Sequence, residues 1–208
     1  MTARGRFISF EGSEGCGKST QISRLKERLV DIGHEVILTR EPGGTAAGEV
    51  IRDLLKHAPE GEGLTPEAEL LLFTASRAQL VREVIEPALR RGTWVLADRF
   101  LDSTTVYQGL ARALDSGAVA AINSFAVGAT VPDLTLLLDL SVAESRARIA
   151  SRDTGNGDRM EREPDQFFET VRAGYLELAR SEPQRIRTID AARPVEEIGR
   201  DIAQILGI

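Results

Sequence analysis

The sequence predicts an α/β fold in three layers, with a five-stranded parallel sheet covered by helices on both faces. Residues 93–98 and 134–140 are almost continuously apolar, as is typical of central parallel strands that are buried on both sides. Strand-like and helix-like segments alternate along the chain, which favours a parallel sheet. At 208 residues, with 42% hydrophobic and 28% charged residues, the chain is expected to form a single domain over 1–208.

Five short segments rich in apolar and β-branched residues are predicted as the strands. They are residues 6–10, 35–39, 93–98, 134–140 and 186–190.

Helical periodicity predicts the main helices between them. Residues 20–30 place Ile22, Leu25, Leu29 and Ile32 on one face, and Gly33 is expected to end this helix. A long helix is expected to begin at Thr65-Pro66, because proline suits the first helical position, and to bend or break near Pro87. A closing helix is predicted over 195–206. Residues 151–162 interrupt the periodicity with Gly155-Asn156-Gly157 and are expected to form a mobile lid loop.

Residues 12–19 match the phosphate-binding pattern G-x-x-x-x-G-K-[ST], between a predicted strand and a predicted helix. Lys18 is expected to reach the β- and γ-phosphates, and the Ser19 hydroxyl to ligate Mg²⁺. A chance match in a chain of this length is on the order of one in a hundred. The sequence thus predicts the P-loop NTPase fold and an ATP site, whose expected residues are Gly12, Ser13, Glu14, Gly15, Cys16, Gly17, Lys18, Ser19 and Thr20.

Composition excludes several other classes. The formal net charge of −6 argues against binding to a nucleic acid polymer. Cys16 is the only cysteine, so neither an intrachain disulfide nor a cysteine metal site can form. No apolar run approaches the roughly 18 residues of a membrane span, and no secretory signal is recognisable, so no membrane association and a cytoplasmic location are expected. The N-K-x-D sequence of GTPases is absent as well.

Arginines follow the predicted strands where ligands of open α/β sheets bind. Arg40 follows the second strand and Arg99 the third, while Arg152, Arg159 and Arg162 lie in the loop. Because the carboxyl ends of parallel strands converge on one crevice, these side chains predict a second, phosphate-bearing substrate beside the triphosphate.

Several further motifs occur in a fixed order along nearly the whole chain. They are Phe10-Glu11-Gly12, Thr39-Arg40-Glu41-Pro42-Gly43-Gly44-Thr45, Leu72-Phe73-Thr74-Ala75-Ser76-Arg77, Asp98-Arg99-Phe100, Ser103-Thr104-Thr105-Val106-Tyr107-Gln108, Pro132-Asp133-Leu134-Thr135 and Ile189-Asp190-Ala191. Together they resemble the thymidylate kinase family, of the bacterial type. The resemblance implies phosphorylation of dTMP to dTDP with Mg²⁺-ATP, in the de novo and salvage routes to dTTP.

The resemblance also implies roles for individual residues in the dTMP site. Arg77 would donate to thymine O4, Phe73 would stack on the base, and Thr104 would lie near N3. Arg99, helped by Arg40 and Arg52, would hold the phosphate, and Tyr107 would lie under the deoxyribose. The complete implied set is Glu14, Arg40, Pro42, Arg52, Phe73, Arg77, Arg99, Ser103, Thr104, Tyr107 and Gln108.

For catalysis the resemblance implies Lys18, Arg99 and an arginine from the lid. Eukaryotic-type members carry arginine at the position of Gly15, so here the lid is expected to supply it, with Arg152 as first candidate and Arg159 as second. Ser19 and Asp98 are the expected metal residues, partly through water. Direct in-line transfer needs no covalent intermediate and no dedicated base.

Two other activities stay open: a kinase for another nucleoside monophosphate, and a non-enzymatic regulator that binds nucleotide. A homodimer is expected from the resemblance, and the apolar stretch 117–127 would supply a helix face for it or else belong to the core.

Overall fold

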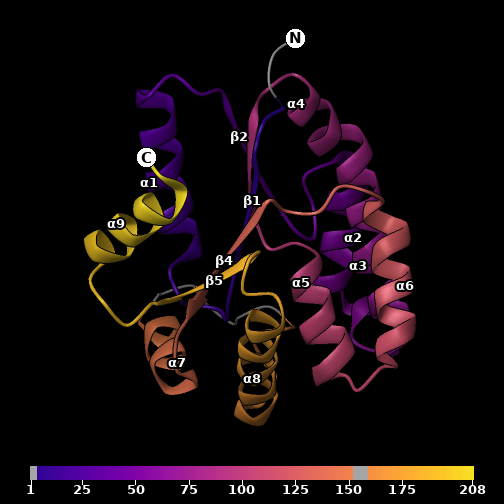
Figure 1. Cartoon of the computed structure of the whole chain (residues 1–208). Helices are drawn as coiled ribbons and strands as arrows, with labels where there is room; N and C mark the ends of the chain where they lie inside the picture. Colours follow the sequence, from indigo (N-terminus) through magenta and orange to yellow (C-terminus); the bar gives the residue numbers. More distant parts are fainter. Residues whose placement is uncertain (1–3, 152–158) are drawn as a thin grey trace.

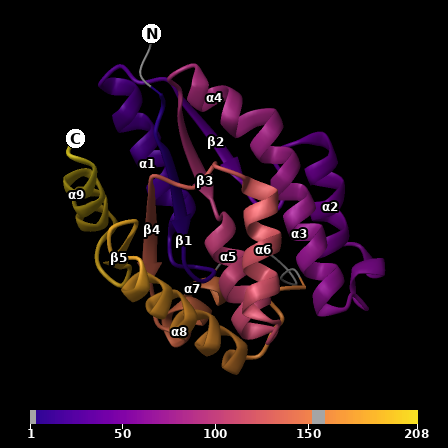
Figure 2. The same cartoon turned by 45° about the vertical axis from the view of Figure 1, so that its right-hand side comes forward.

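The computed structural model describes residues 4–151 and 159–208, and it contains a parallel five-stranded sheet in the order β2-β3-β1-β4-β5. The strands are β1 (Phe7–Glu11), β2 (Val36–Arg40), β3 (Trp94–Asp98), β4 (Leu134–Asp139) and β5 (Ile186–Asp190). Figure 2 shows β1 between β3 and β4, with helices on both sides of the sheet. The α/β prediction is confirmed, and each strand begins and ends within one residue of its predicted bounds.

Helices cover both faces of the sheet (Figure 1). One face carries α1 (Lys18–Asp31) and α9 (Val195–Leu206), which also contact each other. The other face carries α3 (Pro66–Leu80), α4 (Glu86–Arg90), α5 (Leu101–Thr104), α6 (Ser116–Val127) and α8 (Asp165–Ser181). Two more helices pack on these: α2 (Ala46–Lys56) contacts α3, and α7 (Val142–Ala150) contacts α8. A 3-10 turn (Pro59–Gly61) and two π-helical segments (Val81–Ile85 and Thr105–Ala111) complete the described elements.

The central strands are apolar on both sides because the core lies on both sides. In β1, Ile8 and Phe10 pack toward α1 and α9, whereas Phe7 packs with α4, β3 and Phe100 on the opposite face. Alternate residues of a strand point to opposite faces, so a strand with both faces covered by helices reads as a continuous apolar run.

A buried polar group on α5 interrupts this core. Asp102, only 1% exposed, accepts two hydrogen bonds from Arg185 at 2.7 and 2.8 Å and one from the Thr135 hydroxyl at 2.9 Å. Thr135 in turn accepts from the Ser9 hydroxyl at 2.9 Å. These bonds tie α5 to β1, to β4 and to the residue that precedes β5.

The predicted helices are found, with local differences. The closing helix matches its predicted bounds, and Thr65 caps α3 by accepting a hydrogen bond from the backbone of Ala68. The expected irregularity near Pro87 begins earlier, as the π-helical turn at Val81–Ile85. Ile32 was expected on the buried face of the first helix, and this was wrong: the chain turns at Gly33 with φ +90°, and Ile32 is 52% exposed. Helices α2, α5, α7 and α8 were not predicted.

The lid prediction falls mainly outside the described residues, since 152–158 are not among them. Of the residues that follow, Met160 is only 4% exposed and packs in a cluster with Phe168 and Tyr107. The expectation of an exposed loop is therefore wrong at Met160, because this side chain joins the core.

The single tryptophan lies at the amino end of β3. Trp94 is 7% exposed, with the Arg6 guanidinium 5.0 Å from its ring and the His34 ring 4.8 Å away. No helix among residues 4–151 and 159–208 combines the length and apolar character needed to cross a bilayer.

Candidate active site

The phosphate-binding loop connects β1 to α1 and is held in one conformation by glycine. Gly12 has φ +131°, and a Cβ atom there would lie 2.4 Å from the carbonyl oxygen of Leu138. Gly17, the residue before α1, has φ +95°. Lys18 is 6% exposed and donates from Nζ to the carbonyl oxygens of Gly12 at 3.2 Å and Ser13 at 2.9 Å. The loop is thus pre-shaped around an ammonium group, and its helix N-terminus attracts anions.

Helix α7 closes against the same loop at Gly15. This residue has φ +73°, and a Cβ atom would meet the carbonyl oxygen of Ser145 at 3.0 Å. The Ser145 hydroxyl donates to the carbonyl oxygen of Glu14 at 2.6 Å. A side chain at Gly15 would be strained and crowded, so this chain is not built to carry an arginine within the loop.

Two oxygens suitable for Mg²⁺ meet at the start of α1. Ser19 Oγ donates to Asp98 Oδ2 at 3.2 Å, because Asp98 ends the strand that pairs with β1. No group of three or more His, Cys, Asp or Glu side chains in the described chain could hold a metal ion. Mg²⁺ commonly uses one or two carboxylates together with substrate phosphates and water, so this pair of residues fits it.

An open cleft of about 930 Å³ runs from the phosphate loop across the ends of β2 and β3. Arg40, Arg52, Asp98 and Arg99 line it, together with Lys56, which the sequence analysis did not single out. Arg40 forms an exposed ion pair with Glu49 at 2.8 Å, and Arg52 donates to the carbonyl oxygen of Pro42 at 2.9 Å. The residues predicted to hold a substrate phosphate are therefore brought together.

Arg99 is the most constrained cation of the cleft. It adopts φ +71°, donates to Glu14 at 2.8 Å and to the hydroxyls of Ser103 and Tyr175 at 3.3 Å, and lies over the Tyr107 ring at 5.0 Å. Burial alone would raise the pKa of Glu14, but the charges of Arg99 and Lys18 outweigh burial and lower that pKa to about 2. Glu14 is therefore a carboxylate near neutral pH and keeps Arg99 aimed into the cleft.

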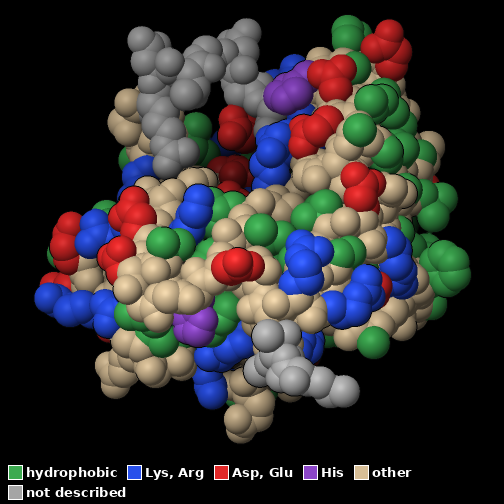
Figure 3. All heavy atoms as spheres, turned by 90° about the horizontal axis from the view of Figure 1, so that it is seen from above, with side chains coloured by type: hydrophobic (Ala, Val, Ile, Leu, Met, Phe, Trp, Pro, Cys, Tyr) green, Lys and Arg blue, Asp and Glu red, His purple; other side chains and the backbone are tan. Residues whose placement is uncertain are grey.

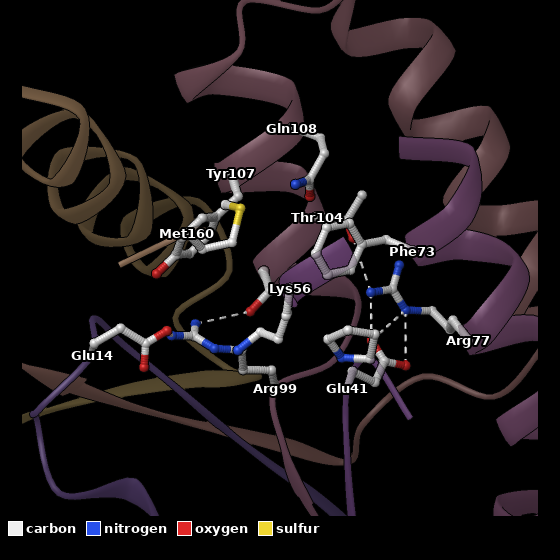
Figure 4. A pocket seen from close by; sticks show the side chains of 12 residues that line it. Glu14, Glu41, Lys56, Phe73, Arg77, Arg99, Thr104, Tyr107, Gln108 and Met160 are labelled. Atoms are coloured by element: carbon white, nitrogen blue, oxygen red, sulfur yellow. Dashed lines mark hydrogen bonds and ion pairs between the residues drawn. The ribbon is translucent and has the colours of Figure 1, made fainter. Parts of the chain in front are cut away.

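A smaller pocket of about 430 Å³ adjoins the cleft and shares Arg99 with it (Figure 4). Its walls come from α3, from the turn after β2 and from the helical segment after β3. The lining residues include Glu41, Pro42, Phe73, Arg77, Ser103, Thr104, Tyr107, Gln108 and Met160. Phe73 is half-buried and faces this pocket, which differs from the setting of an ordinary core aromatic residue.

Arg77 is fixed in this pocket by partners that the sequence analysis missed. It is 1% exposed and donates to Glu41 through Nε and Nη2 at 2.5–3.1 Å, to Asn123 through Nη1 at 2.8 Å, and to Thr104 through Nη2 at 2.9 Å. These bonds leave one N–H of Nη1 without a partner among the described residues. A buried, oriented donor can thus face a ligand in the pocket.

Tyr107 supplies a buried hydroxyl beside Arg99. The residue is 6% exposed, and its oxygen has no hydrogen-bond partner in the described parts of the chain. Burial raises the pKa of Tyr107 to about 12, so the hydroxyl stays protonated.

Glu11 is a buried acid of this site to which sequence reasoning gave no role, although it stands in the motif that enters the phosphate loop. It is fully buried and accepts hydrogen bonds from the Phe100 amide at 2.7 Å, the Ser103 hydroxyl at 2.6 Å and the Tyr175 hydroxyl at 2.7 Å. Burial, reinforced by the charge of Asp102, raises the pKa of Glu11 to about 7.

Of the two arginines predicted as the catalytic group of the lid, the structure describes only Arg159. Arg152 lies outside the described residues. Arg159 does not line the phosphate cleft; it donates through Nε to the carbonyl oxygen of Leu55 at 2.9 Å and through Nη2 to Glu69 at 2.6 Å.

A parallel sheet with a phosphate loop at the carboxyl end of its central strand, next to a pocket with a buried arginine and an aromatic wall, defines a P-loop kinase that acts on small nucleotides. A family model described as thymidylate kinase matches residues 10–202. The chain belongs to the thymidylate kinase family.

Relatives and a solved structure agree with this assignment. The thymidylate kinase of Geobacter sulfurreducens is 49% identical, with 97% of this chain and 96% of the relative covered. That of Pseudomonas putida is 50% identical, with 96% and 95% covered. The crystal structure of thymidylate kinase from Ehrlichia chaffeensis superposes with a TM-score of 0.80 at 31% identity, over 98% of this chain and 99% of that one.

Replacing Glu11 by glutamine should change how stability depends on pH. The folded protein keeps a proton on Glu11 up to a pKa of about 7, whereas the unfolded chain loses it near 4.5, so this residue destabilises the wild type as pH rises between those values. Relative to the wild type, Glu11→Gln should therefore gain up to about 3 kcal/mol in free energy of unfolding between pH 4.5 and 7.5.

Urea unfolding followed by circular dichroism at both pH values measures this difference. Exposed Glu177→Gln is the matched control, since both partners of its ion pair with Arg180 are 71% exposed, and it should follow the wild type. A constant difference between Glu11→Gln and the wild type across this range would contradict the assigned cause.

Proposed function

We propose that this protein transfers the γ-phosphoryl group of ATP to dTMP, forming dTDP and ADP, in the de novo and salvage routes to dTTP. The observation that carries the proposal is the continuity of the two cavities: Arg99 lines both the phosphate cleft and the pocket that contains Phe73 and Arg77. A nucleoside monophosphate in the pocket would place its phosphate at Arg99, facing the phosphate loop. Since both substrates are intracellular nucleotides, the cytoplasm remains the expected location.

The base would be read by Arg77 and held by Phe73. Thymine has a carbonyl acceptor at position 4, to which the remaining Nη1 donor of Arg77 would bind. Cytosine has an amino donor there, so two donors would face each other in a dry pocket, and the cost of the unpaired groups would oppose binding. Tyr107, buried beside Arg99, would lie under the deoxyribose and crowd a ribose 2′-hydroxyl.

The transfer itself would rely on positioning and charge. Lys18 would exchange the carbonyl oxygens of Gly12 and Ser13 for the β- and γ-phosphates, while Arg99, helped by Arg40 and Arg52, holds the acceptor phosphate in line. The acceptor phosphate is already ionised near neutral pH, so it attacks the γ-phosphorus directly and the β–γ bridging oxygen leaves with ADP. Ser19 and Asp98 would hold Mg²⁺, which neutralises charge on the phosphates.

A panel of acceptors tests the reaction. ADP release in the presence of Mg²⁺-ATP should be fast with dTMP and at least about 100-fold slower with dCMP, because a hydrogen-bond mismatch in a dry site discriminates strongly. Turnover of UMP should also be slow, because Tyr107 would crowd its 2′-hydroxyl. Equal or faster turnover with another monophosphate would assign a different acceptor. Absence of turnover with every acceptor would favour a nucleotide-dependent regulator.

Arg152 is the proposed catalytic arginine of the lid. Support comes from Arg159, whose guanidinium is engaged by Glu69 and Leu55 outside the phosphate cleft. An arginine that stabilises the transferring phosphoryl group contributes about 10³- to 10⁵-fold in rate. Arg152→Ala should lower kcat by about 10³-fold or more while the Kd for dTMP, measured by calorimetry, stays within about threefold. A small loss of kcat would transfer the role to Arg159, and Arg162→Ala is the control from the same segment.

A homodimer is proposed through α3 and α6. Leu71 is 55% exposed and Phe125 88% exposed, and both line a shallow apolar groove with Ala75, Ala78 and Ile122. Hydrophobic side chains gather along the right edge of Figure 3, the side on which α6 lies in Figure 1. Exposed apolar surface of this kind is typical of an association site.

Phe125→Ser should shift the mass measured by light scattering from dimer toward monomer by removing the largest exposed side chain of the groove. Val50→Ser, at a position that is also largely exposed (72%) but lies outside the groove, should leave the mass unchanged. A monomeric wild type would exclude the dimer.

A further inference from the structure

Another buried acid lies on α3, the helix proposed to read the base. Glu69 is 2% exposed and precedes Phe73 and Arg77 by one and two helical turns on α3. Residues four apart share a helical face, so Glu69 belongs to the same side of α3 as the two side chains proposed to hold the base. It does not line the base pocket itself and was not singled out from the sequence.

Glu69 is an ionised carboxylate that accepts from three side chains. Gln108 Nε2 donates to Oε1 at 2.9 Å, Arg112 Nε to Oε1 at 3.3 Å and Arg159 Nη2 to Oε2 at 2.6 Å, while Arg112 also pairs with Glu163 at 2.5 Å. Burial would raise the pKa of Glu69, but the hydrogen bonds from Gln108 and Arg159 and the two arginine charges outweigh it and lower that pKa.

This contact determines which end of the Gln108 amide faces the pocket. A carboxylate can only accept hydrogen bonds, so the amide must turn its NH₂ group toward Glu69. Its carbonyl oxygen is then left for the pocket, which Gln108 lines together with Phe73 and Thr104 (Figure 4). Gln108 is 2% exposed, so its side chain is held between Glu69 and the pocket with little surface open to bulk solvent.

The fixed carbonyl complements the donor of Arg77. Thymine presents an acceptor at O4 and a donor at N3–H, which match a donor from Arg77 and an acceptor from Gln108. Cytosine presents the reverse pair, an amino donor at position 4 and a lone pair at N3. With both protein groups fixed, cytosine would meet donor against donor and acceptor against acceptor, whereas a freely rotating amide could adapt to either base.

We propose that Glu69 is a positioning residue for base selection, which fixes the Gln108 amide with its carbonyl oxygen toward the base. The inference rests on the proposed function, because it takes a thymine base as the ligand of the pocket. Its chemistry is nevertheless separate from that of Arg77, since it concerns the adjacent N3 position of the ring and the orientation of another side chain.

Glu69→Gln tests the proposal by replacing an acceptor-only group with one that also donates. Gln108 can then turn its NH₂ group into the pocket, so kcat/KM for dCMP should rise relative to dTMP, and the ratio of the two values should fall about tenfold. Glu163→Gln is the matched control: it makes the same chemical change in the same cluster, where Glu163 accepts from Arg112, whereas the side-chain hydrogen bond of Gln108 in the described chain goes to Glu69, so the control should keep the wild-type ratio. Glu69→Asp, which keeps acceptor-only chemistry, should retain more of the ratio than Glu69→Gln.

The outcomes separate this role from a merely structural one. Equal loss of kcat/KM for dTMP and dCMP in Glu69→Gln, or an unchanged ratio, would overturn the proposal. If Glu69→Gln does not fold, Gln108→Leu carries the test: the ratio should fall by a similar factor, and an unchanged ratio would show that the amide reads no base. A wild-type enzyme that does not prefer dTMP refutes the proposed function instead, before any variant is compared.

Discussion

The active site depends on the buried hydrogen bonds that Glu11 accepts at the end of the central strand. Its two carboxyl oxygens hold the Phe100 amide and the Ser103 hydroxyl, and these two contacts bracket the turn in which Arg99 adopts its left-handed conformation. From this turn the chain continues into the helical segment that carries Tyr107 and the rest of the pocket wall. Acceptor phosphate, sugar and base would therefore all be placed relative to the phosphate loop by one carboxyl group on the same strand as that loop.

The other buried charges also serve geometry more than stability. Arg77 with Glu41, and Asp102 with Arg185, each join segments that are far apart in the chain. Taking two charges out of water costs several kcal/mol, and a well-packed apolar pair would often be at least as stable. Their benefit is directional, because a guanidinium held by two or more hydrogen bonds cannot rotate away from the site.

The features of the fold and of the site that could be predicted from the sequence are those defined by residues close together in the chain. Buried parallel strands and the phosphate loop are defined by neighbouring residues, so all five strands and the 12–19 loop were predicted. Arg77 and Phe73 were found through a motif, but the partners of Arg77, Glu41 and Asn123, lie 36 and 46 residues away and are brought together only by the fold. Helix α7 was missed although its start signal is local, since Ser141 caps the helix and pairs with Glu144 in a capping box. Helix α8 follows a charged and irregular stretch without a side-chain cap, and its stability comes from tertiary packing.

The surroundings of Trp94 have a practical consequence for studying this molecule. The only indole of the chain starts β3, at the opposite end of that strand from Asp98 and the nucleotide site, enclosed by Arg6 and His34. Its emission is therefore a probe of the integrity of the sheet and is poorly placed to sense ligand occupancy. Nucleotide binding will therefore have to be measured with an introduced fluorophore or by calorimetry, and intrinsic tryptophan fluorescence can be used to follow unfolding.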